Sequence, residues 1–238
     1  SKIIPSRGTW VEIESDSEGV ISVRIDRKRK FAGTTLLRVL GVKDDEAIKK
    51  LFAKDEFAKN SIEKTLVKDH TKSQDEAYID IHKRLRDGDL ATAENAKEFV
   101  DSIFDSERYD LSPVGRHRFN KRFGLSMDDK ELKRKTISVS DLVTIISHVA
   151  LLNNTPNAVE DDIDHLGSRR VRFVGELFQQ NIRKGIAQIK RNIQNKMSTI
   201  ETDVTLPVQF VAPRPLQARI KEFFTTNQLS QFMTQENP

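Results

Sequence analysis

Residues 9–26, TWVEIESDSEGVISVRID, alternate apolar and polar side chains on both sides of a turn-like segment. The flanks Thr9–Glu14 and Val20–Asp26 are rich in β-forming residues, and a period of two is typical of strands with one buried face. Between them, Ser15–Gly19 contains aspartate and glycine, which favour tight turns. The pattern predicts a β-hairpin whose second strand leads into the basic run Arg27–Lys30.

Helical spacing takes over after Gly33. Apolar residues recur three and four positions apart, and Asp44, Thr92 and the pair Ser140-Asp141 stand where N-capping residues are expected. The predicted helices are Thr34–Leu40, Asp44–Phe52, Glu56–Val67, Gln74–Leu85 (ended by Asp87-Gly88), Thr92–Phe104, Val114–Phe123 and Ser140–Leu152, with Arg108–Pro113 as a linker.

The longest periodic segment lies in the last third of the chain. One apolar stripe runs over about seven turns, with arginines and lysines on the opposite face. The stripe consists of Val171, Val174, Phe178, Ile182, Ile186, Ile189, Ile193 and Met197. It predicts a long amphipathic helix with a buried stripe. An extended, proline-containing segment, Thr205–Pro215, follows, and Pro215 is expected in the first turn of a helix to Phe224.

The polar connection Asn153–Gly167 indicates a boundary between two packing units. We therefore predict domains at residues 1–166 and 167–238. The predicted fold class is α+β and mostly α, with an N-terminal β-hairpin and helices followed by the long amphipathic helix.

Composition excludes several classes of protein. The 238 residues include no cysteine, which excludes disulfides and thiolate metal sites and favours a reducing, cytoplasmic compartment. No signal peptide is visible, and the longest apolar stretch, Leu142–Leu152, is too short to span a bilayer. We therefore expect no membrane partner. Since the chain begins in a strand-like pattern and ends without a cap, we expect it to be a piece of a longer protein.

Charge is unevenly distributed in a chain whose net charge is only +4. Residues 41–110 carry 18 acidic and 13 basic side chains, whereas basic residues concentrate in Arg24–Lys30, Arg116–Arg122 and Arg169–Arg191. Such runs neutralise phosphates in nucleic-acid-binding proteins. A solvated helix face is the alternative for any one run, and the three together favour a polyanionic partner.

Most catalytic motifs are absent. The sequence has no phosphate-binding loop, no G-x-S-x-G and no H-E-x-x-H, and its five histidines lack ligand spacing. The acidic run Asp161–Asp164 is either a Mg²⁺ site, which would suit a hydrolase, or a set of charge partners for the basic helix. Trp10, the single tryptophan, is either a core or rim residue or a platform for an unpaired base.

Five strings resemble the β subunit of bacterial DNA-directed RNA polymerase in their order and spacing. They are Ile3-Ile-Pro-Ser-Arg-Gly-Thr-Trp10, Val23-Arg-Ile-Asp-Arg-Lys-Arg-Lys30, Arg108-Tyr-Asp-Leu-Ser-Pro-Val-Gly-Arg116, Asp161-Asp-Ile-Asp-His-Leu-Gly-Ser-Arg-Arg170 and Phe223-Phe-Thr-Thr-Asn-Gln-Leu-Ser-Gln-Phe-Met233. The resemblance implies an internal fragment that covers the β lobe and then the protrusion-return and external fork segment, which leads into the rifamycin-pocket region.

The resemblance also implies DNA-binding roles. In the family, the residue matched by Trp10 stacks on an unpaired base of the non-template strand, and Ile163, Asp164 and Arg169 match a pocket for a flipped guanine. A carboxylate suits a guanine edge because it accepts hydrogen bonds from the N–H donors of the base. The DNA-binding residues implied are Trp10, Asp26, Arg27, Arg86, Arg108, Ile163, Asp164 and Arg169. Salt bridges within the lobe are the alternative role for the arginines.

The C-terminal string resembles part of the rifamycin pocket beside the RNA path. The implied contacts are Gln228, Leu229, Gln231 and Phe232. The sequence departs from the family at Thr234, where aspartate is usual, and at Asp87, where proline is typical. The first departure leaves rifamycin sensitivity open.

The resulting hypothesis is a part of RNA polymerase that lines the downstream DNA cleft and holds the non-template strand in transcription. The resemblance implies DNA, nascent RNA and the β′, α, ω and sigma subunits as partners, in the bacterial cytoplasm and nucleoid. It implies no cofactor in this fragment, because the β′ subunit holds the catalytic Mg²⁺, and no activity of the fragment alone. The alternative is a stand-alone helical module that binds nucleic acid or protein without catalysis.

Overall fold

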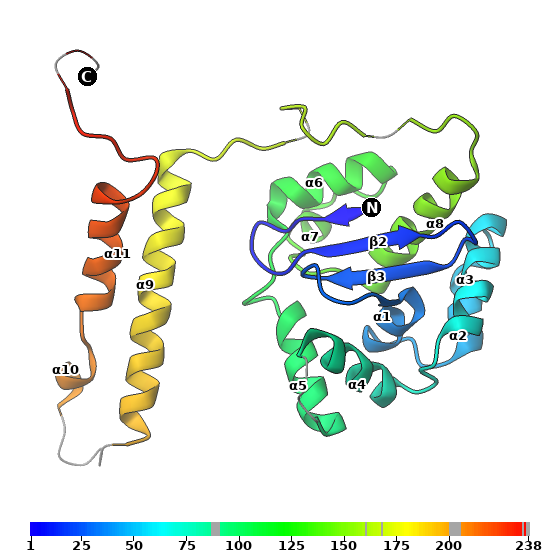
Figure 1. Cartoon of the computed structure of the whole chain (residues 1–238), viewed down its shortest axis with the longest axis horizontal. Coiled ribbons are helices and arrows are strands. Elements are labelled where there is room, and N and C mark those ends of the chain that lie inside the picture. The colour runs from blue at the N-terminus through cyan, green and yellow to red at the C-terminus, as the bar shows by residue number, and fades with distance from the viewer. Residues whose placement is uncertain (87–90, 160, 168, 200–205, 235, 237–238) are drawn as a thin grey trace. The chain divides into compact units, whose positions relative to one another are not determined.

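The computed structural model divides the chain into two compact units, Ser1–Val159 and Glu160–Pro238 (Figure 1). It describes residues 1–86, 91–159, 161–167, 169–199, 206–234 and 236. The predicted ending of a helix at Asp87-Gly88 lies outside these residues. The boundary between the two units, after Val159, falls within the predicted connection 153–167. The domain limits of 1–166 and 167–238 stay a prediction.

The N-terminal unit is built on a four-stranded antiparallel sheet in chain order. Its strands are β1 (Lys2–Ile3), β2 (Val11–Ser15), β3 (Ile21–Ile25) and β4 (Phe31–Ala32). The hairpin is confirmed, with Val11 opposite Ile25 and Ser15 opposite Ile21. In its turn, the Asp16 carboxylate accepts hydrogen bonds from the backbone N–H groups of Glu18 (3.0 Å) and Val20 (2.7 Å).

Eight helices of the described residues follow the sheet in this unit. They are α1 (Gly33–Val39), α2 (Asp45–Leu51), α3 (Glu56–Lys68), α4 (Gln74–Leu85), α5 (Ala93–Phe104), α6 (Ser112–Phe123), α7 (Asp129–Leu132) and α8 (Val139–Asn154). The mostly helical α+β class is confirmed. The Thr92 hydroxyl caps α5 by accepting a hydrogen bond from the Asn95 N–H, whereas Asp44, at the N-cap position of α2, makes no side-chain capping bond.

Two predicted helix starts were wrong. Helix α6 begins at Ser112, inside the predicted linker, because Pro113 fits the first turn, where no N–H donor is needed. Helix α8 is capped by Ser138, and Asp141 completes a reciprocal capping box with it. Both helices therefore start earlier than the sequence analysis placed them.

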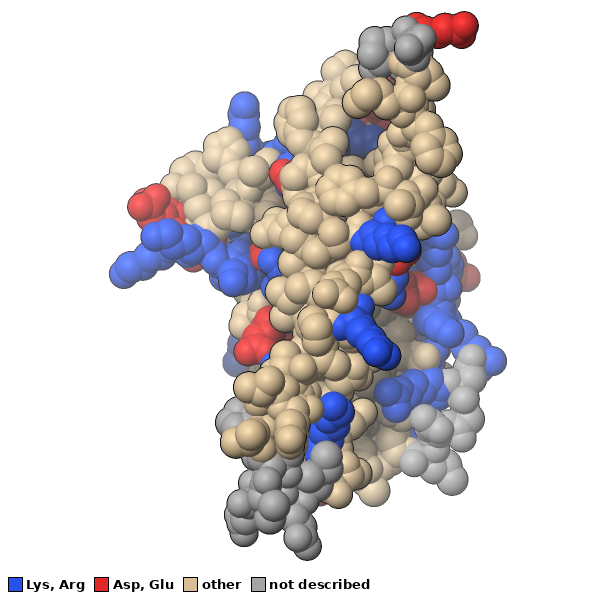
Figure 2. Space-filling view, turned by 90° about the vertical axis from the view of Figure 1, so that its left-hand side faces the viewer, with Lys and Arg blue, Asp and Glu red and all other residues tan. Residues whose placement is uncertain are grey.

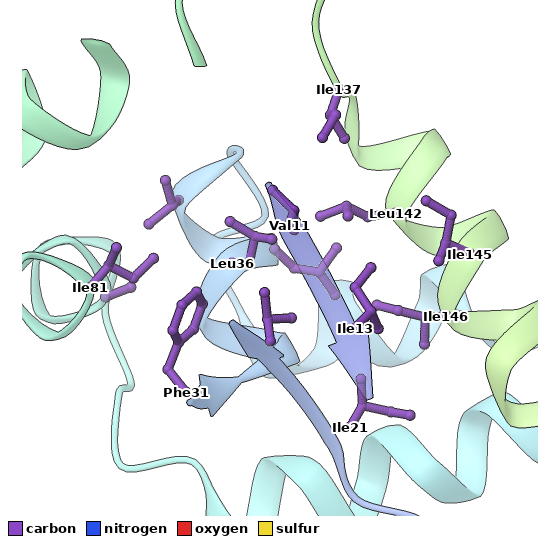
Figure 3. Packing of buried hydrophobic residues seen from close by; sticks show 14 of the residues in the cluster. Val11, Ile13, Ile21, Phe31, Leu36, Ile81, Ile137, Leu142, Ile145 and Ile146 are labelled. Atoms are coloured by element: carbon purple, nitrogen blue, oxygen red, sulfur yellow. The ribbon is translucent and has the colours of Figure 1, made fainter. Parts of the chain in front are cut away.

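One face of the sheet packs on helices. Along β2 and β3 the inward residues alternate with outward ones, and α1, α3 and α8 contact this face. Figure 3 shows the strand residues Val11, Ile13 and Ile21 meeting Leu36 from α1 and Leu142, Ile145 and Ile146 from α8. The core fixes which side chains of the hairpin point outward.

Two arginines are buried within this unit. The side chain of Arg38 is fully buried and pairs with Asp45, with Asp69 3.9 Å away. Arg116, also fully buried, lies 2.9 Å from the Asp141 carboxylate and donates to the Thr136 carbonyl (2.8 Å). The interpretation of Arg116–Arg122 as a surface run is therefore wrong for Arg116, which ties α6 to α8.

The second unit is a pair of helices packed against each other. Helix α9 (Val174–Met197) packs along α11 (Arg214–Thr225), and the short helix α10 (Pro207–Phe210) precedes α11. Phe178 lies 5.3 Å from Phe223 between ring centroids. Pro215 stands in the first turn of α11, as predicted.

Two expectations for this unit were wrong. Helix α9 starts at Val174, so Val171 lies outside it, and helix α10 interrupts the segment predicted as extended. The apolar stripe is only partly covered within this chain, since Ile186 is 54% exposed, and its burial against a partner stays a prediction. Figure 2 shows the column of α10 and α11 as a mainly uncharged surface.

Candidate nucleic-acid interface

The outward face of the hairpin is polar and charged. Since Val11 and Ile13 point into the core, Glu12 and Glu14 point to the opposite face. Glu12 lies 2.7 Å from Lys2 Nζ on β1, its partner in register, and Arg24 on β3 lies 3.7 Å from Glu12 and 3.8 Å from Glu14. Cross-strand ion pairs therefore cover this face of the sheet.

Lys30 completes the charge network at the edge strand. Its Nζ lies 2.5 Å from the Glu14 carboxylate. A hydrogen bond from Lys30 is the largest effect on Glu14 and lowers its pKa; burial opposes this, and the charges of Lys30 and Arg24 add to the lowering. Glu14 is therefore held ionised, and it takes up part of the positive charge that the sequence analysis assigned to the run Arg24–Lys30.

Trp10 lies beside this network and is half-buried. Lys2 Nζ is 4.4 Å and Arg27 Cζ is 4.9 Å from the centroid of its ring. The Asp26 N–H donates to the Trp10 carbonyl oxygen at 2.9 Å, which ties the turn after β3 to the tryptophan. The structure therefore brings three predicted residues, Trp10, Asp26 and Arg27, together.

Two of these residues adopt an unusual backbone conformation. Asp26 has a φ of 49° and Arg27 a φ of 58°. These values lie in the left-handed region, which residues other than glycine rarely occupy. Non-glycine residues held in this region cost free energy and are frequent at ligand sites. The turn is the means by which Arg27 reaches the indole.

The contact of Lys2 with Trp10 was missed by the sequence analysis. No local motif marks a single lysine, and the contact depends on β1, a strand of two residues. Two residues are too few to show a periodic pattern. The register of β1 against β2 places Lys2 opposite Glu12 and hence on the face of Trp10.

The segment before Trp10 packs on the string that contains Arg108. Gly8 has a φ of 123°, and a Cβ there would lie 2.7 Å from the Tyr109 ring. The backbones of Arg7 and Asp110 exchange two hydrogen bonds, of 3.1 and 2.8 Å. Two of the five strings quoted above are therefore neighbours in space.

Arg108 and Arg86 each contact a side chain of their own unit. Arg108 Nη1 donates to the Ser102 hydroxyl at 3.2 Å. Arg86 Cζ lies 4.4 Å from the centroid of Phe99, whose ring also meets His82 edge-on. These contacts agree with the alternative of intramolecular roles, and the DNA-binding roles of both arginines stay a prediction.

In the second unit, the loop before α9 brings Asp164 and Arg169 together. Arg169 Nη1 lies 3.5 Å from Asp164 Oδ1, and both side chains are exposed. The Asp162 carboxylate accepts the N–H groups of Asp164 (3.0 Å) and His165 (3.2 Å), which turns the loop. Ile163 is 78% exposed. The predicted guanine-binding residues thus lie on one open loop.

The residues of the predicted rifamycin pocket are spread along the chain after α11. The Leu229 N–H bonds to the Asn227 side chain at 2.9 Å, and Ser230 donates to the Phe223 carbonyl. Gln228, Leu229 and Gln231 are exposed, and Phe232 is 92% exposed. Nothing in the described residues gathers them into a pocket.

The described residues do not fit a magnesium site. Among them, no group of three or more histidine, aspartate or glutamate side chains could hold a metal ion, and Asp164 pairs with Arg169. Among all the residues that the structure describes, no helix is both long and apolar enough to cross a membrane.

Comparison with known proteins identifies the family to which the chain belongs. The family model for RNA polymerase Rpb2, domain 2, matches residues 1–172, so the chain belongs to this family. It is 41% identical to the DNA-directed RNA polymerase subunit beta of Streptomyces avermitilis and 40% identical to those of a Nocardioides species and Synechococcus elongatus. Each match covers 100% of this chain and 21% of the relative, so the chain spans about a fifth of their length.

Proposed function

We propose that the chain is a segment of the β subunit of a bacterial DNA-directed RNA polymerase and binds the unpaired non-template strand during transcription. The observation that carries this proposal is the position of Trp10 on the outward face of the sheet, with the cations of Lys2 and Arg27 at 4.4 and 4.9 Å. Sites for single-stranded nucleic acid combine aromatic rings that stack on bases with cations that bind phosphates.

The proposed residues have different roles. Trp10 stacks on a base, Asp26 holds the turn through its N–H bond to the Trp10 carbonyl, and Arg27 supplies charge to the phosphates. Arg86 and Arg108 face the same strand. In the second unit, Asp164 accepts hydrogen bonds from a guanine edge, while Arg169, 3.5 Å away, contacts the base or its phosphate, and Ile163 packs on the base.

The remaining roles belong to the complete enzyme. The proposed partners are the downstream DNA duplex, nascent RNA near the C-terminal residues 228–232, and the β′, α, ω and sigma subunits, in the cytoplasm and nucleoid. Gln228, Leu229, Gln231 and Phe232 contribute to the rifamycin pocket. The catalytic Mg²⁺ is held by the β′ subunit.

Binding of single-stranded DNA by the 238-residue chain tests the role of Trp10. We expect a short labelled oligothymidylate to bind with an affinity that falls steeply with salt, and Trp10→Ala to weaken binding roughly tenfold, since one base–aromatic stack contributes about 1–3 kcal/mol. The control is Phe57→Ala, which removes another exposed aromatic ring, on α3. Equal binding by both variants would refute the role of Trp10. Binding of a protein partner without salt dependence would favour the stand-alone module instead.

The guanine preference is tested separately in the second unit. Oligonucleotides that differ at one position, guanine or adenine, are compared on the wild-type chain and on Asp164→Ala. We expect the variant to lose the preference for guanine, because the acceptor for the base N–H groups is gone. Asp161→Ala makes the same change of charge three residues away and should keep the preference. A preference unchanged in Asp164→Ala would refute the assignment.

A further inference from the structure

The indole of Trp10 is already covered by cations. Lys2 Nζ and Arg27 Cζ lie 4.4 and 4.9 Å from its centroid. A cation over an aromatic face occupies the space in which a base would stack. If an unpaired base stacks on a face of Trp10 that a cation covers, in the way the proposed function uses the ring, the contact with that cation has to be given up.

Lys2 is fixed by a second interaction. Its ammonium group lies 2.7 Å from the Glu12 carboxylate, and the two residues are partners in the β1–β2 register. The strand pairing holds the Lys2 backbone and the ion pair holds its side chain. Moving Lys2 from the ring would break a cross-strand ion pair as well as the contact with the indole.

Arg27 is held by its backbone and leaves its side chain free to move. The N–H of the preceding residue, Asp26, is bonded to the Trp10 carbonyl, so the turn stays beside the indole whatever the guanidinium does. The Arg27 side chain is exposed, and no carboxylate of the described residues forms an ion pair with it. Of the two cations, Arg27 is the one that can leave the ring without losing another partner.

We propose that Arg27 is an exchangeable cover of Trp10. In the free chain its guanidinium lies over the indole; when an unpaired base stacks there, the guanidinium moves to the phosphate of that nucleotide. Lys2 stays in place and positions the ring. Stacking of a base is stronger than an exposed cation–π contact, and the phosphate gives the displaced guanidinium a charged acceptor in exchange.

The exchange predicts that the phosphate contact of Arg27 depends on the base. The test uses the 238-residue chain and two probes of equal length, oligothymidylate and an abasic oligonucleotide with the same phosphates. On oligothymidylate, Arg27→Gln should reduce the slope of log affinity against log salt by about 0.7, the value for one phosphate of a single strand. Between about 50 and about 200 mM salt, the variant should lose roughly 2.6-fold less affinity than wild type.

The abasic probe separates exchange from simple attraction. Without a base, Arg27 should stay over the indole, so Arg27→Gln and wild type should show the same slope. Lys2→Gln should keep the wild-type slope on both probes, because Lys2 remains at Glu12. Lys28→Gln, a loss of the same charge in the next residue of the turn, is the matched control. Any effect it has on the slope should be equal on the two probes.

The fluorescence emission of Trp10 distinguishes a failure of the proposed exchange from a failure of the proposed function. If oligothymidylate leaves the emission of the wild-type chain unchanged, no base stacks on Trp10, and the proposed function is wrong. If the emission changes but Arg27→Gln lowers the slope equally on both probes, or not at all, the exchange is wrong and the proposed function stands. A loss of slope in Lys2→Gln equal to that in Arg27→Gln would also refute the exchange.

Discussion

Replacing Gly8 by alanine tests whether the close approach of Gly8 to Tyr109 positions Trp10. The Cβ of alanine would lie 2.7 Å from the Tyr109 Cδ2 atom and 3.3 Å from its Cα. The ring cannot move aside, because Tyr109 is fully buried. Overpacking of this kind costs about 1–3 kcal/mol. The φ of 123° adds backbone strain of order 1–3 kcal/mol. Because alanine lowers the conformational entropy of the unfolded chain, it also stabilises the folded state by about 0.4–1 kcal/mol. The expected net loss of unfolding free energy is therefore about 1–6 kcal/mol, with about 3 kcal/mol as the central value.

A second glycine separates the two contributions. Gly41 has a φ of 112°, and nothing lies within 4 Å of a Cβ placed there. Gly41→Ala therefore has the backbone strain without the contact. Both variants are unfolded in urea and followed by the fluorescence of Trp10, which reports on the N-terminal unit. We expect Gly8→Ala to lose about 1–3 kcal/mol more than Gly41→Ala. Equal losses would show that the Gly8–Tyr109 contact does not constrain the segment before Trp10.

Three further predictions concern buried groups of the same unit. Arg116→Met should cost about 3 kcal/mol of unfolding free energy, since it leaves part of a buried ion pair without its partner. Lys121→Met, at an exposed site on the same helix α6, should change stability by less than about 0.5 kcal/mol; similar urea midpoints for the two variants would contradict this. Tyr109→Phe should be neutral or stabilising by about 1 kcal/mol, because the buried hydroxyl has no hydrogen-bond partner among the described residues; a marked loss of stability would reveal one. Burial, helped by a hydrogen bond to Asp101, raises the pKa of Tyr78 from 10.0 to about 12. The stability that Tyr78 contributes through this shift is therefore complete below pH 10 and lost as pH rises toward 12. Between pH 8 and pH 11, the wild type should lose about 1.4 kcal/mol more unfolding free energy than Tyr78→Phe. Equal losses would refute this.

Local signals predicted the elements that have a clear period or cap. The hairpin, α4 and the capping of α5 by Thr92 are confirmed. Strands β1 and β4 have two residues each, too few for a pattern. The cap of α8 was placed two residues late although Ser138 and Asp141 have the spacing of a capping box; here the signal was present and was missed.

Buried charges could not be predicted from local sequence. Arg116 stands in a basic run with no acidic neighbour, and its carboxylate partner, Asp141, is 25 residues away on another helix. Only the packing of α6 against the start of α8 brings the two together. A count of basic residues therefore overestimates the charge available to a polyanion, and the pairs of Arg24 and Lys30 with Glu14 reduce it further.

The same reasoning explains why the strings that carry the resemblance occur together. The string ending at Trp10 and the string beginning at Arg108 are joined by the Arg7–Asp110 backbone bonds and by Gly8 against Tyr109. A larger residue at position 8 would push the chain away from Tyr109 and move Trp10, two residues on. Position 8 requires a glycine because Tyr109 leaves no room for a Cβ there. The packing of these two residues in turn fixes the position of Trp10. What the sequence shows as two separate motifs is one packed unit that sets the indole on the outward face of the sheet, beside Lys2 and Arg27.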